Sequence, residues 1–393
     1  MTSVIELPVT NRTDDHLRIL VVAESFLPQI NGVTNSVRRV LEHLEVEGHE
    51  AALVAPTGPA EYAGFPVLRV RGASLPFYKD FRVGLETRRR LRGVMMRFGP
   101  DVVHVASPAT LGYQAIKVAG ELGIPSVAIY QTDLVGFAER YPMLHRTGCS
   151  MAAAALTRMI HQRADRTLVP STASQRQLQG LGIERTALWP RGVDLVGFDP
   201  ARIDYGLRSR LAPNGETIVG YVGRLAPEKE LGLLAHLAED DRYALVVVGG
   251  GPEEERLRSL LPGAHFLGVL HGAELGAVYA SLDVFVHTGR HETFCQSAQE
   301  ALASGVPVVA PRSGGPVDVV DDRVTGFLYE PGDGADLAVM VRRLHDDTRL
   351  RRRMGRDARA AVAGRSWQAV NDRLVAHYRD VVGRRVAVRD RAA

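Results

Sequence analysis

Short apolar, β-branched runs alternate with longer helical stretches along nearly the whole chain, and this alternation occurs twice. The runs are residues 17–23, 51–55, 102–105 and 126–130 in the first half, and 217–221, 244–248, 284–286 and 306–310 in the second. A continuous apolar run between helical stretches is typical of a parallel strand that is buried on both faces. The sequence therefore predicts two Rossmann-like, doubly wound α/β domains.

The segment 196–215 separates the two patterns and is rich in Pro, Gly, Asp and Asn, so we interpret it as a linker. The predicted organisation is an N-terminal domain at 1–195, a C-terminal domain at 196–370, and a helix and tail at 371–393 that could pack back on the first domain. Ligands of open α/β sheets bind beyond the carboxyl ends of the strands. We therefore expect a central cleft between the two domains.

Charge and cysteine content exclude several classes of protein. The 48 Lys and Arg residues nearly balance the 45 Asp and Glu residues, giving a net charge of +3, which argues against a nucleic-acid binder. Two cysteines are too few for a disulfide scaffold or a zinc site. The chain begins without the pattern of a secretory signal, and no apolar run is long enough to span a membrane. We expect a cytoplasmic protein, and attachment to a membrane surface remains open.

Two cations follow the first strand of the second half. Arg224 and Lys229 lie five residues apart at a predicted strand-to-helix turn, and Lys229 is one of only three lysines in the chain. Two cations at a helix N-terminus are unfavourable unless an anion lies between them, and a pyrophosphate would fit. The alternative is an ordinary turn at which Glu228 and Glu230 neutralise both cations.

Two carboxylates follow in the same half, with seven residues between them. Glu292 lies in the predicted loop after the strand at 283–287, and Glu300 lies one turn into the predicted helix at 296–304. Carboxylates placed in this way could hold two hydroxyl-bearing ends of one extended ligand. The alternative is a loop charge and a helix-surface residue. The triple glycine at 249–251 predicts another turn of close backbone approach.

The first half of the chain contains further candidate site residues. The loop that contains Gly32 lies between a strand and a helix, an arrangement that suits a phosphate, although a glycine here could simply turn the chain. It is neither a dinucleotide fingerprint nor a P-loop. His104 is a cleft candidate or a buried structural residue. A predicted helix at 84–98 carries several arginines and could contact an anionic lipid surface, or it could pack its apolar side on the sheet.

Taken together, five motifs resemble the retaining GT-B glycosyltransferases of family 4 over residues 17–367. They are Asn31-Gly32-Val33, Arg191-Gly192-Val193-Asp194, Gly223-Arg224 with Lys229, the Glu292 and Glu300 pair with its following helix, and Ser313-Gly314-Gly315-Pro316. The runs 22–29, 130–138 and 189–194 most resemble actinobacterial GDP-mannose-dependent α-mannosyltransferases that act on glycolipids.

The resemblance implies roles for the donor-side residues. Arg224 and Lys229 would hold the donor diphosphate and stabilise the leaving group. Glu292 would bind hydroxyls of the transferred sugar, and Glu300 would bind the nucleotide ribose. Backbone N–H groups would approach the sugar and phosphates at Gly32, Thr293, Phe294 and Cys295.

On the acceptor side, family members often carry a histidine where this chain has Gln131. The resemblance therefore implies that Gln131 and Asp133 make the polar contacts with the acceptor, and Asp133 is counted among the catalytic residues. His104 is a further acceptor-side candidate. In such retaining enzymes the acceptor hydroxyl attacks from the face that the diphosphate leaves, and a leaving-group oxygen takes its proton. No metal and no cofactor are predicted, and Asp321-Asp322 is interpreted as a surface turn.

The predicted function is transfer of mannose from GDP-mannose to a glycolipid or inositol-containing acceptor. The alternatives are a UDP-sugar-dependent transferase of sulfolipid or thiol-cofactor type, which the loop at 267–271 would decide, and a GT-B sugar-nucleotide epimerase. A periplasmic-type binding module is disfavoured because the chain shows no signal pattern. The expected partners are a nucleotide sugar, a lipid or inositol-containing acceptor and an anionic membrane surface at the inner face of the plasma membrane, but no nucleic acid.

Overall fold

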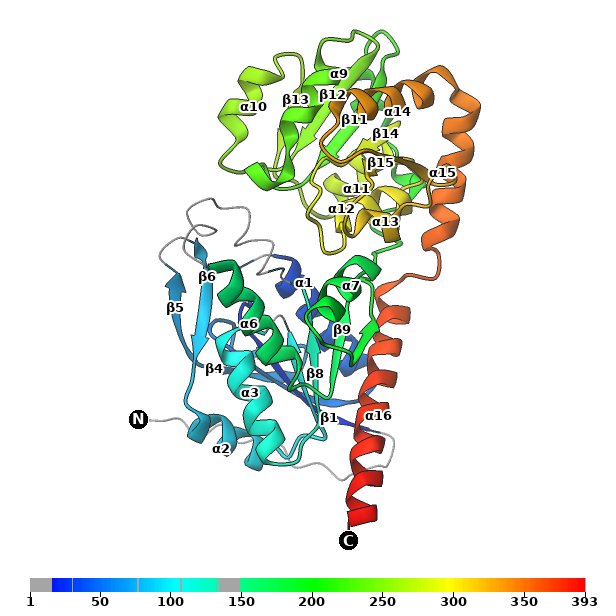
Figure 1. Cartoon of the computed structure of the whole chain (residues 1–393). Helices are drawn as coiled ribbons and strands as arrows, with labels where there is room; N and C mark the ends of the chain where they lie inside the picture. The colour runs from blue at the N-terminus through cyan, green and yellow to red at the C-terminus, as the bar shows by residue number, and fades with distance from the viewer. Residues whose placement is uncertain are drawn as a thin grey trace. The chain divides into compact units, whose positions relative to one another are not determined.

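The computed structural model describes residues 16–29, 31–75, 78–106, 108–131, 133 and 149–392, and it consists of two compact units (Figure 1). The first unit comprises Met1–Pro170, Ser174–Trp189 and Asn371–Ala393. The second comprises Ser171–Ala173 and Pro190–Val370.

The first unit is built on an eight-stranded sheet in which every pair is parallel except β3 with β4. Its strands, in spatial order, are β10 (Thr186–Leu188), β9 (Arg166–Val169), β8 (Ser126–Ile129), β7 (Val102–Ala106), β1 (Arg18–Ala23), β2 (Glu50–Ala55), β4 (Phe65–Arg69) and β3 (Glu61–Tyr62). Strands β5 (Arg71–Leu75) and β6 (Tyr78–Leu85) form a separate antiparallel pair. The central strands are buried, as their uninterrupted apolar runs predict.

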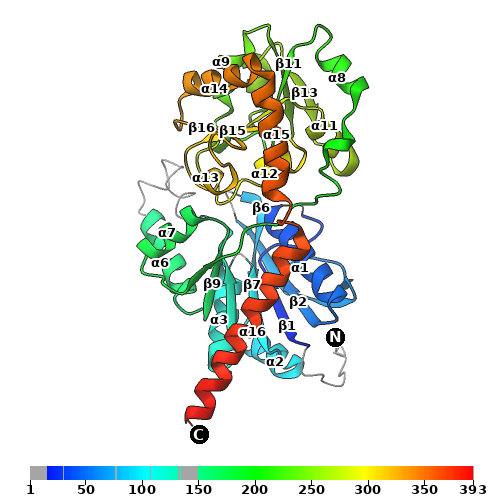
Figure 2. The same cartoon turned by 90° about the vertical axis from the view of Figure 1, so that its right-hand side faces the viewer.

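The helices of the first unit include α1 (Gly32–Val46), α2 (Arg88–Phe98), α3 (Thr110–Glu121), α6 (Cys149–His161) and α7 (Thr172–Gly180). The last helix, α16 (Trp367–Ala392), enters this unit from Asn371 onward (Figure 2). Asn371 donates a hydrogen bond from Nδ2 to the carbonyl oxygen of Arg39 at 2.9 Å, and Arg166 pairs with Asp380. The C-terminal helix therefore packs on the first unit. Among the described residues, no helix is both long enough and apolar enough to cross a bilayer.

The arginine-rich helix is shorter than the sequence predicts. It begins at Arg88 instead of residue 84, because residues 78–85 form β6. Thr87 caps the new start by accepting a hydrogen bond from the Arg90 backbone N–H at 3.3 Å. The apolar side of α2 is buried against the sheet, as the alternative interpretation holds; its buried residues are Leu91, Val94, Met95 and Phe98.

The second unit contains a six-stranded, all-parallel sheet. Its spatial order is β13 (His265–Gly268), β12 (Tyr243–Val248), β11 (Thr217–Val222), β14 (Val284–Val286), β15 (Val308–Pro311) and β16 (Gly326–Tyr329). This order reverses direction between β11 and β14, the adjacent strands at the centre. Such a topological switch point is where doubly wound sheets bind ligands, at the carboxyl ends of the strands.

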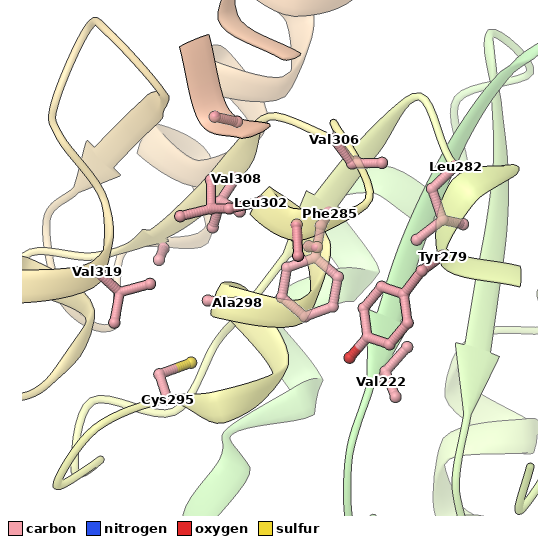
Figure 3. Close-up of a cluster of buried hydrophobic side chains, with 14 of the residues drawn as sticks. Val222, Tyr279, Leu282, Phe285, Cys295, Ala298, Leu302, Val306, Val308 and Val319 are labelled. Carbon is pink, nitrogen blue, oxygen red and sulfur yellow. The ribbon is translucent and has the colours of Figure 1, made fainter. Parts of the chain in front are cut away.

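Apolar clusters cover both faces of this sheet. Figure 3 shows part of one cluster, with Tyr279, Phe285 and Cys295 among its side chains. The helices of the unit include α9 (Ala235–Ala238), α10 (Glu254–Leu260), α11 (Gly272–Ala280), α12 (Gln296–Ala303), α13 (Pro316–Val319), α14 (Gly334–Asp346) and α15 (Thr348–Val362).

The sequence predicts a linker at 196–215, but this segment is an integral part of the second unit. It contains a 3₁₀ turn, η1 (Pro200–Arg202), and helix α8 (Tyr205–Leu211). Phe198 and Leu207 pack against the core. Arg359 ties the segment down by donating to the carbonyl oxygens of Leu195 and Phe198. Pro, Gly, Asp and Asn are as common at the ends of short helices and turns as they are in linkers. Composition alone therefore does not distinguish a linker from a folded segment with short elements.

Candidate functional site

The charged residues of the second unit meet at its topological switch point. The turn after β11 carries Arg224 and Lys229, and the loop after β14 carries Glu292. Lys229 donates a hydrogen bond from Nζ to Glu292 Oε1, and both side chains are largely buried, with 21% and 19% of their surfaces exposed. Two loops that are distant in sequence thus place opposite charges together beyond the strand ends.

Lys229 is positioned by a 3₁₀ turn, η2 (Pro227–Lys229), of which it is the last residue. A second 3₁₀ turn, η3 (Leu231–Leu234), starts after Glu230 and continues directly into α9, so Lys229 lies just before a helical N-terminus and Arg224 lies earlier in the same turn. Thr288 holds the Lys229 backbone by donating from its hydroxyl to the Lys229 carbonyl oxygen. Arg224 pairs with Glu228, as the alternative interpretation allows, while 49% of its side chain stays exposed to solvent.

Glu292 has two cationic partners on the same oxygen. Besides Lys229, the Nε2 atom of His287 lies 3.3 Å from Glu292 Oε1. Burial raises the pKa of Glu292, but Lys229 and His287 together outweigh it and hold the pKa well below its usual range. The carboxylate is therefore ionised at neutral pH. Sequence reasoning missed His287, because a histidine directly after a buried strand resembles an ordinary core residue.

A glycine turn supports the Glu292 loop. Gly315 donates its backbone N–H to the Glu292 carbonyl oxygen at 2.7 Å. Gly314 has a φ of +61°, and a Cβ atom there would lie 2.6 Å from the same oxygen. Only glycine fits this combination of backbone angle and close approach. The Ser313-Gly314-Gly315-Pro316 motif thus sets the position of Glu292.

Glu300 lies on α12 and accepts a hydrogen bond from the Tyr279 hydroxyl at 3.1 Å. Burial raises its pKa to about 7, against the lowering effects of Tyr279, Gln296 and Arg191. Glu300 therefore changes charge near neutral pH.

Arg191 connects the two carboxylates electrostatically. Burial lowers its pKa to about 10, and the charges of Glu292 and Glu300 oppose that shift. Its backbone carbonyl accepts from Gln299 Nε2 at 2.8 Å, which anchors the domain-junction motif to α12. The sequence identifies Arg191 only as part of a motif and predicts no role for its side chain. Its closeness to both carboxylates depends on the fold.

Two of the residues that closely follow Glu292 have buried side chains. Phe294 and Cys295 are buried in the apolar cluster, and Cys295 adopts a left-handed conformation with a φ of +82° immediately before α12. Thr293 is half-buried. Any donor contact by Phe294 or Cys295 would therefore use main-chain atoms, in keeping with the predicted role.

The triple-glycine turn has a packing explanation. A Cβ atom on Gly249 would lie 1.9 Å from the Gly223 carbonyl oxygen, and one on Gly251 would lie 2.3 Å from that of Leu225. Leu225 also donates its backbone N–H to the Gly250 carbonyl oxygen at 2.9 Å. The close approach is thus to the turn that carries Arg224.

In the first unit, Gly32 is the first residue of α1. Asn31 caps this helix by accepting from the Thr34 backbone N–H at 2.9 Å, and its own side chain donates to Ser25 Oγ at 2.8 Å. Gly32 thus lies at a capped helix N-terminus that follows β1, the position predicted for it.

Asp133 is held by two donors. The Tyr130 hydroxyl and Gln177 Nε2 reach its Oδ1 atom at 3.1 and 2.9 Å. Gln131 is half-buried next to this group. Residues 132 and 134–148, which contain the rest of the acceptor-side motif, lie outside the described residues.

His104 does not belong with these residues. It lies inside β7, 1% of it is exposed, and its Nδ1 atom is 2.6 Å from the Tyr378 hydroxyl. Burial lowers its pKa to about 3, so the ring stays neutral. His104 therefore has the buried structural role and not the acceptor-side role, because its ring packs against Tyr378 of α16 and is not exposed to a substrate.

Among the described residues, one group of side chains could hold a metal ion. His43 on α1, Glu47 just after α1 and Asp372 on α16 place three ligand atoms within 4.8 Å of one another. His43 and Asp372 already approach each other as an ion pair at 3.3 Å. None of the three is a predicted site residue, and the absence of a catalytic metal stays a prediction.

Comparison with known proteins identifies both halves of the chain. Residues 207–361 match the family model of glycosyl transferases group 1, and residues 30–196 match that of glycosyltransferase family 4. A GDP-mannose-dependent alpha-mannosyltransferase of Mycolicibacterium smegmatis is 49% identical over 94% of this chain and 99% of its own length. One of Corynebacterium glutamicum is 41% identical over 93% and 89%.

More distant relatives share the architecture. A sulfoquinovosyl transferase of Arabidopsis thaliana is 33% identical over 90% of this chain and 72% of its own length. The crystal structure of Anabaena HepE in complex with UDP superposes with a TM-score of 0.76 at 19% identity, covering 93% of this chain and all of that one. This likeness to a GT-B glycosyltransferase, together with the two parallel-sheet α/β units, confirms the predicted fold class.

Proposed function

The chain belongs to glycosyltransferase family 4, and from this premise we propose that it transfers mannose from GDP-mannose to a glycolipid or inositol-containing acceptor, with retention of configuration. The donor part of the proposal is supported by three GDP-mannose-dependent relatives that are 41–49% identical. The acceptor part is supported by more distant relatives: a phosphatidylinositol dimannoside mannosyltransferase is 26% identical over 77% of this chain.

The observation that carries the proposal is the charge cluster at the switch point of the second sheet. Arg224 and Lys229 are two of the cations of that cluster, and we assign them to the donor diphosphate, whose negative charge grows as the glycosidic bond breaks. Glu292 is ionised and accepts hydrogen bonds, so it suits hydroxyls of the transferred sugar.

Glu300 completes the donor site. Its carboxylate is oriented by Tyr279 and suits the vicinal hydroxyls of a ribose, which donate hydrogen bonds. Arg191 lies electrostatically close to both carboxylates and moderates their repulsion.

In the proposed reaction the acceptor oxygen forms a bond to the anomeric carbon as the bond to the diphosphate oxygen breaks. The acceptor proton passes to the leaving diphosphate, so no enzymic nucleophile is required. Gln131 and Asp133 would orient the acceptor hydroxyl, since Tyr130 and Gln177 fix the Asp133 carboxylate. Gly32, at the N-terminus of α1, would place backbone N–H groups near the phosphates.

We also propose that the enzyme works at an anionic membrane surface on the cytoplasmic side. The support is a set of four exposed arginines on α2, namely Arg88, Arg89, Arg90 and Arg97. Each cation near such a surface contributes about 1 kcal/mol. Exchanging Arg89 and Arg97 for Glu should weaken sedimentation with phosphatidylglycerol vesicles and leave the affinity for GDP unchanged. Equal sedimentation of both proteins would contradict the proposal.

A donor screen tests the proposed function. We expect GDP and GDP-mannose to raise the Tm of the full chain more than UDP, ADP and their sugars do. The preferred donor is then incubated with membrane lipids, and mannosyl products are identified by mass spectrometry. Preference for a UDP sugar would favour the sulfolipid-type alternative, and turnover of the donor to an isomeric sugar nucleotide without acceptor would favour an epimerase.

A further inference from the structure

A buried histidine faces the carboxylate that is assigned to the donor sugar. His287 directly follows β14, only 2% of it is exposed, and its ring stacks on Tyr221 with an interplanar angle of 16°. Its backbone N–H donates to the Val309 carbonyl oxygen at 2.9 Å, and its carbonyl oxygen accepts from the Tyr329 hydroxyl at 3.2 Å. The backbone of His287 is therefore held on both sides, and its ring places Nε2 3.3 Å from Glu292 Oε1.

The surroundings of this ring favour its cationic form. Tyr221 on β11, Cys295 before α12, and Glu292 with its partner Lys229 are the titratable groups that face or adjoin it. Burial lowers the pKa of His287, but Cys295 and Glu292 outweigh burial and raise the pKa to about 9. A buried cation is stable only when it is paired, and here Glu292 is the pairing charge.

Binding of a donor would weaken the hydrogen bond between Lys229 and Glu292. Lys229 Nζ is the proposed diphosphate ligand, yet its hydrogen bond goes to Glu292 Oε1. A diphosphate that draws Lys229 toward itself would weaken this bond. The side chain of His287 is too enclosed to follow, so it is the partner that stays on Glu292.

We propose that His287 is a positioning residue that keeps the Glu292 carboxylate oriented toward the transferred sugar while Lys229 engages the diphosphate. This inference rests on the proposed donor site and deepens it. Its specific consequence is that His287 acts on the sugar and leaves the nucleotide contacts unaffected.

The test compares His287→Gln and His287→Phe with the wild-type full chain. Glutamine keeps an N–H donor near the Nε2 position, whereas phenylalanine keeps the stacked ring and removes the donor. His345→Gln is the matched control, because His345 is a histidine of the same unit that pairs with Thr217 Oγ1 at 2.8 Å. The measurements are kcat and KM for GDP-mannose between pH 6 and pH 10, and the Kd of GDP.

We expect His287→Phe to lower kcat by about 10²-fold, the typical effect of misplacing a group that orients a reactant. His287→Gln should recover part of this loss. The Kd of GDP should change by less than about twofold in both variants, since only the sugar contact is lost. Wild-type kcat should fall as the pH rises through about 9, where His287 loses its proton, and this decline should be absent in His287→Gln.

A folded His287→Phe variant with wild-type kcat and an unchanged pH profile would overturn the inference, and so would an equal decline at high pH in His287→Gln. If His287→Phe fails to bind GDP, the pH profile of His287→Gln decides the matter alone. Failure of the proposed function is distinguishable from failure of this inference, because the wild-type chain would then turn over another donor. The same variants would be measured with that donor.

Discussion

Lys229 and Glu292 form a largely buried ion pair that joins the two loops at the switch point of the second sheet. The pair spans 63 positions of sequence, and each partner stabilises the charge of the other. The proposed donor site is thus held together by an internal contact between its own charges. A diphosphate must compete with Glu292 for Lys229, which gives the site a clear set of expected responses to mutation and pH.

Lys229→Ala should lower kcat by about 10²-fold or more, because the leaving diphosphate loses a cation that contacts it directly. His287 still faces Glu292 in this variant, so we expect the fold to persist. Steady-state kinetics with GDP-mannose and circular dichroism are the measurements. Lys117→Ala on α3 is the matched control and should behave like the wild type. Wild-type turnover by Lys229→Ala would remove Lys229 from the catalytic residues.

Binding of GDP should strengthen as the pH rises from 6 to 8. Glu300 loses its proton near pH 7, because burial raises its pKa to that value, and only the ionised carboxylate accepts from both ribose hydroxyls. Isothermal titration calorimetry across this range measures the effect. Glu300→Gln should bind GDP more weakly at pH 8 and show a flat profile. A flat profile in the wild type would contradict the ribose assignment.

Gly314→Ala should reduce activity without unfolding the chain. The added Cβ would lie 2.6 Å from the Glu292 carbonyl oxygen, and the φ of +61° disfavours any L side chain, so the Glu292 loop must move. We expect a decrease in kcat of roughly 10²-fold, because small displacements of positioning groups have large effects. Gly263→Ala is the control, since a Cβ atom added there would meet no other atom within 4 Å. Equal kcat values for the two variants would show that the glycine turn does not set Glu292.

Glu24→Ala should destabilise the first unit by roughly 3 kcal/mol or more, because three backbone donors, two of them buried, would lose their acceptor. The Glu24 carboxylate accepts from the backbone N–H groups of Gly84, Ala109 and Gly112 at 2.9–3.0 Å. Urea denaturation of the full chain measures the change in the free energy of unfolding. Glu45→Ala, at an exposed position of α1, is the control and should change it by less than about 0.5 kcal/mol.

Much of the fold could be predicted from the sequence, because parallel strands are buried on both faces and need continuous apolar runs. The run predicted at 284–286 matches β14, and that predicted at 244–248 lies within β12. The strand β6 was missed, because residues 78–85 do not form the continuous apolar run by which the other strands were predicted. The spacing of Glu292 and Glu300 also indicated a shared site, because a loop and the helix that directly follows it lie close together in any fold.

The sequence by itself determined the two α/β domains, the family resemblance and the main candidate charges. Only the tertiary structure decided which histidine matters. His104 and His287 both accompany buried strands, yet His104 meets a tyrosine 274 positions away and stays neutral, while His287 meets Glu292 and is cationic. Burial by itself would lower the pKa of both rings. The difference comes from the partner, and the chain path brings each partner into place.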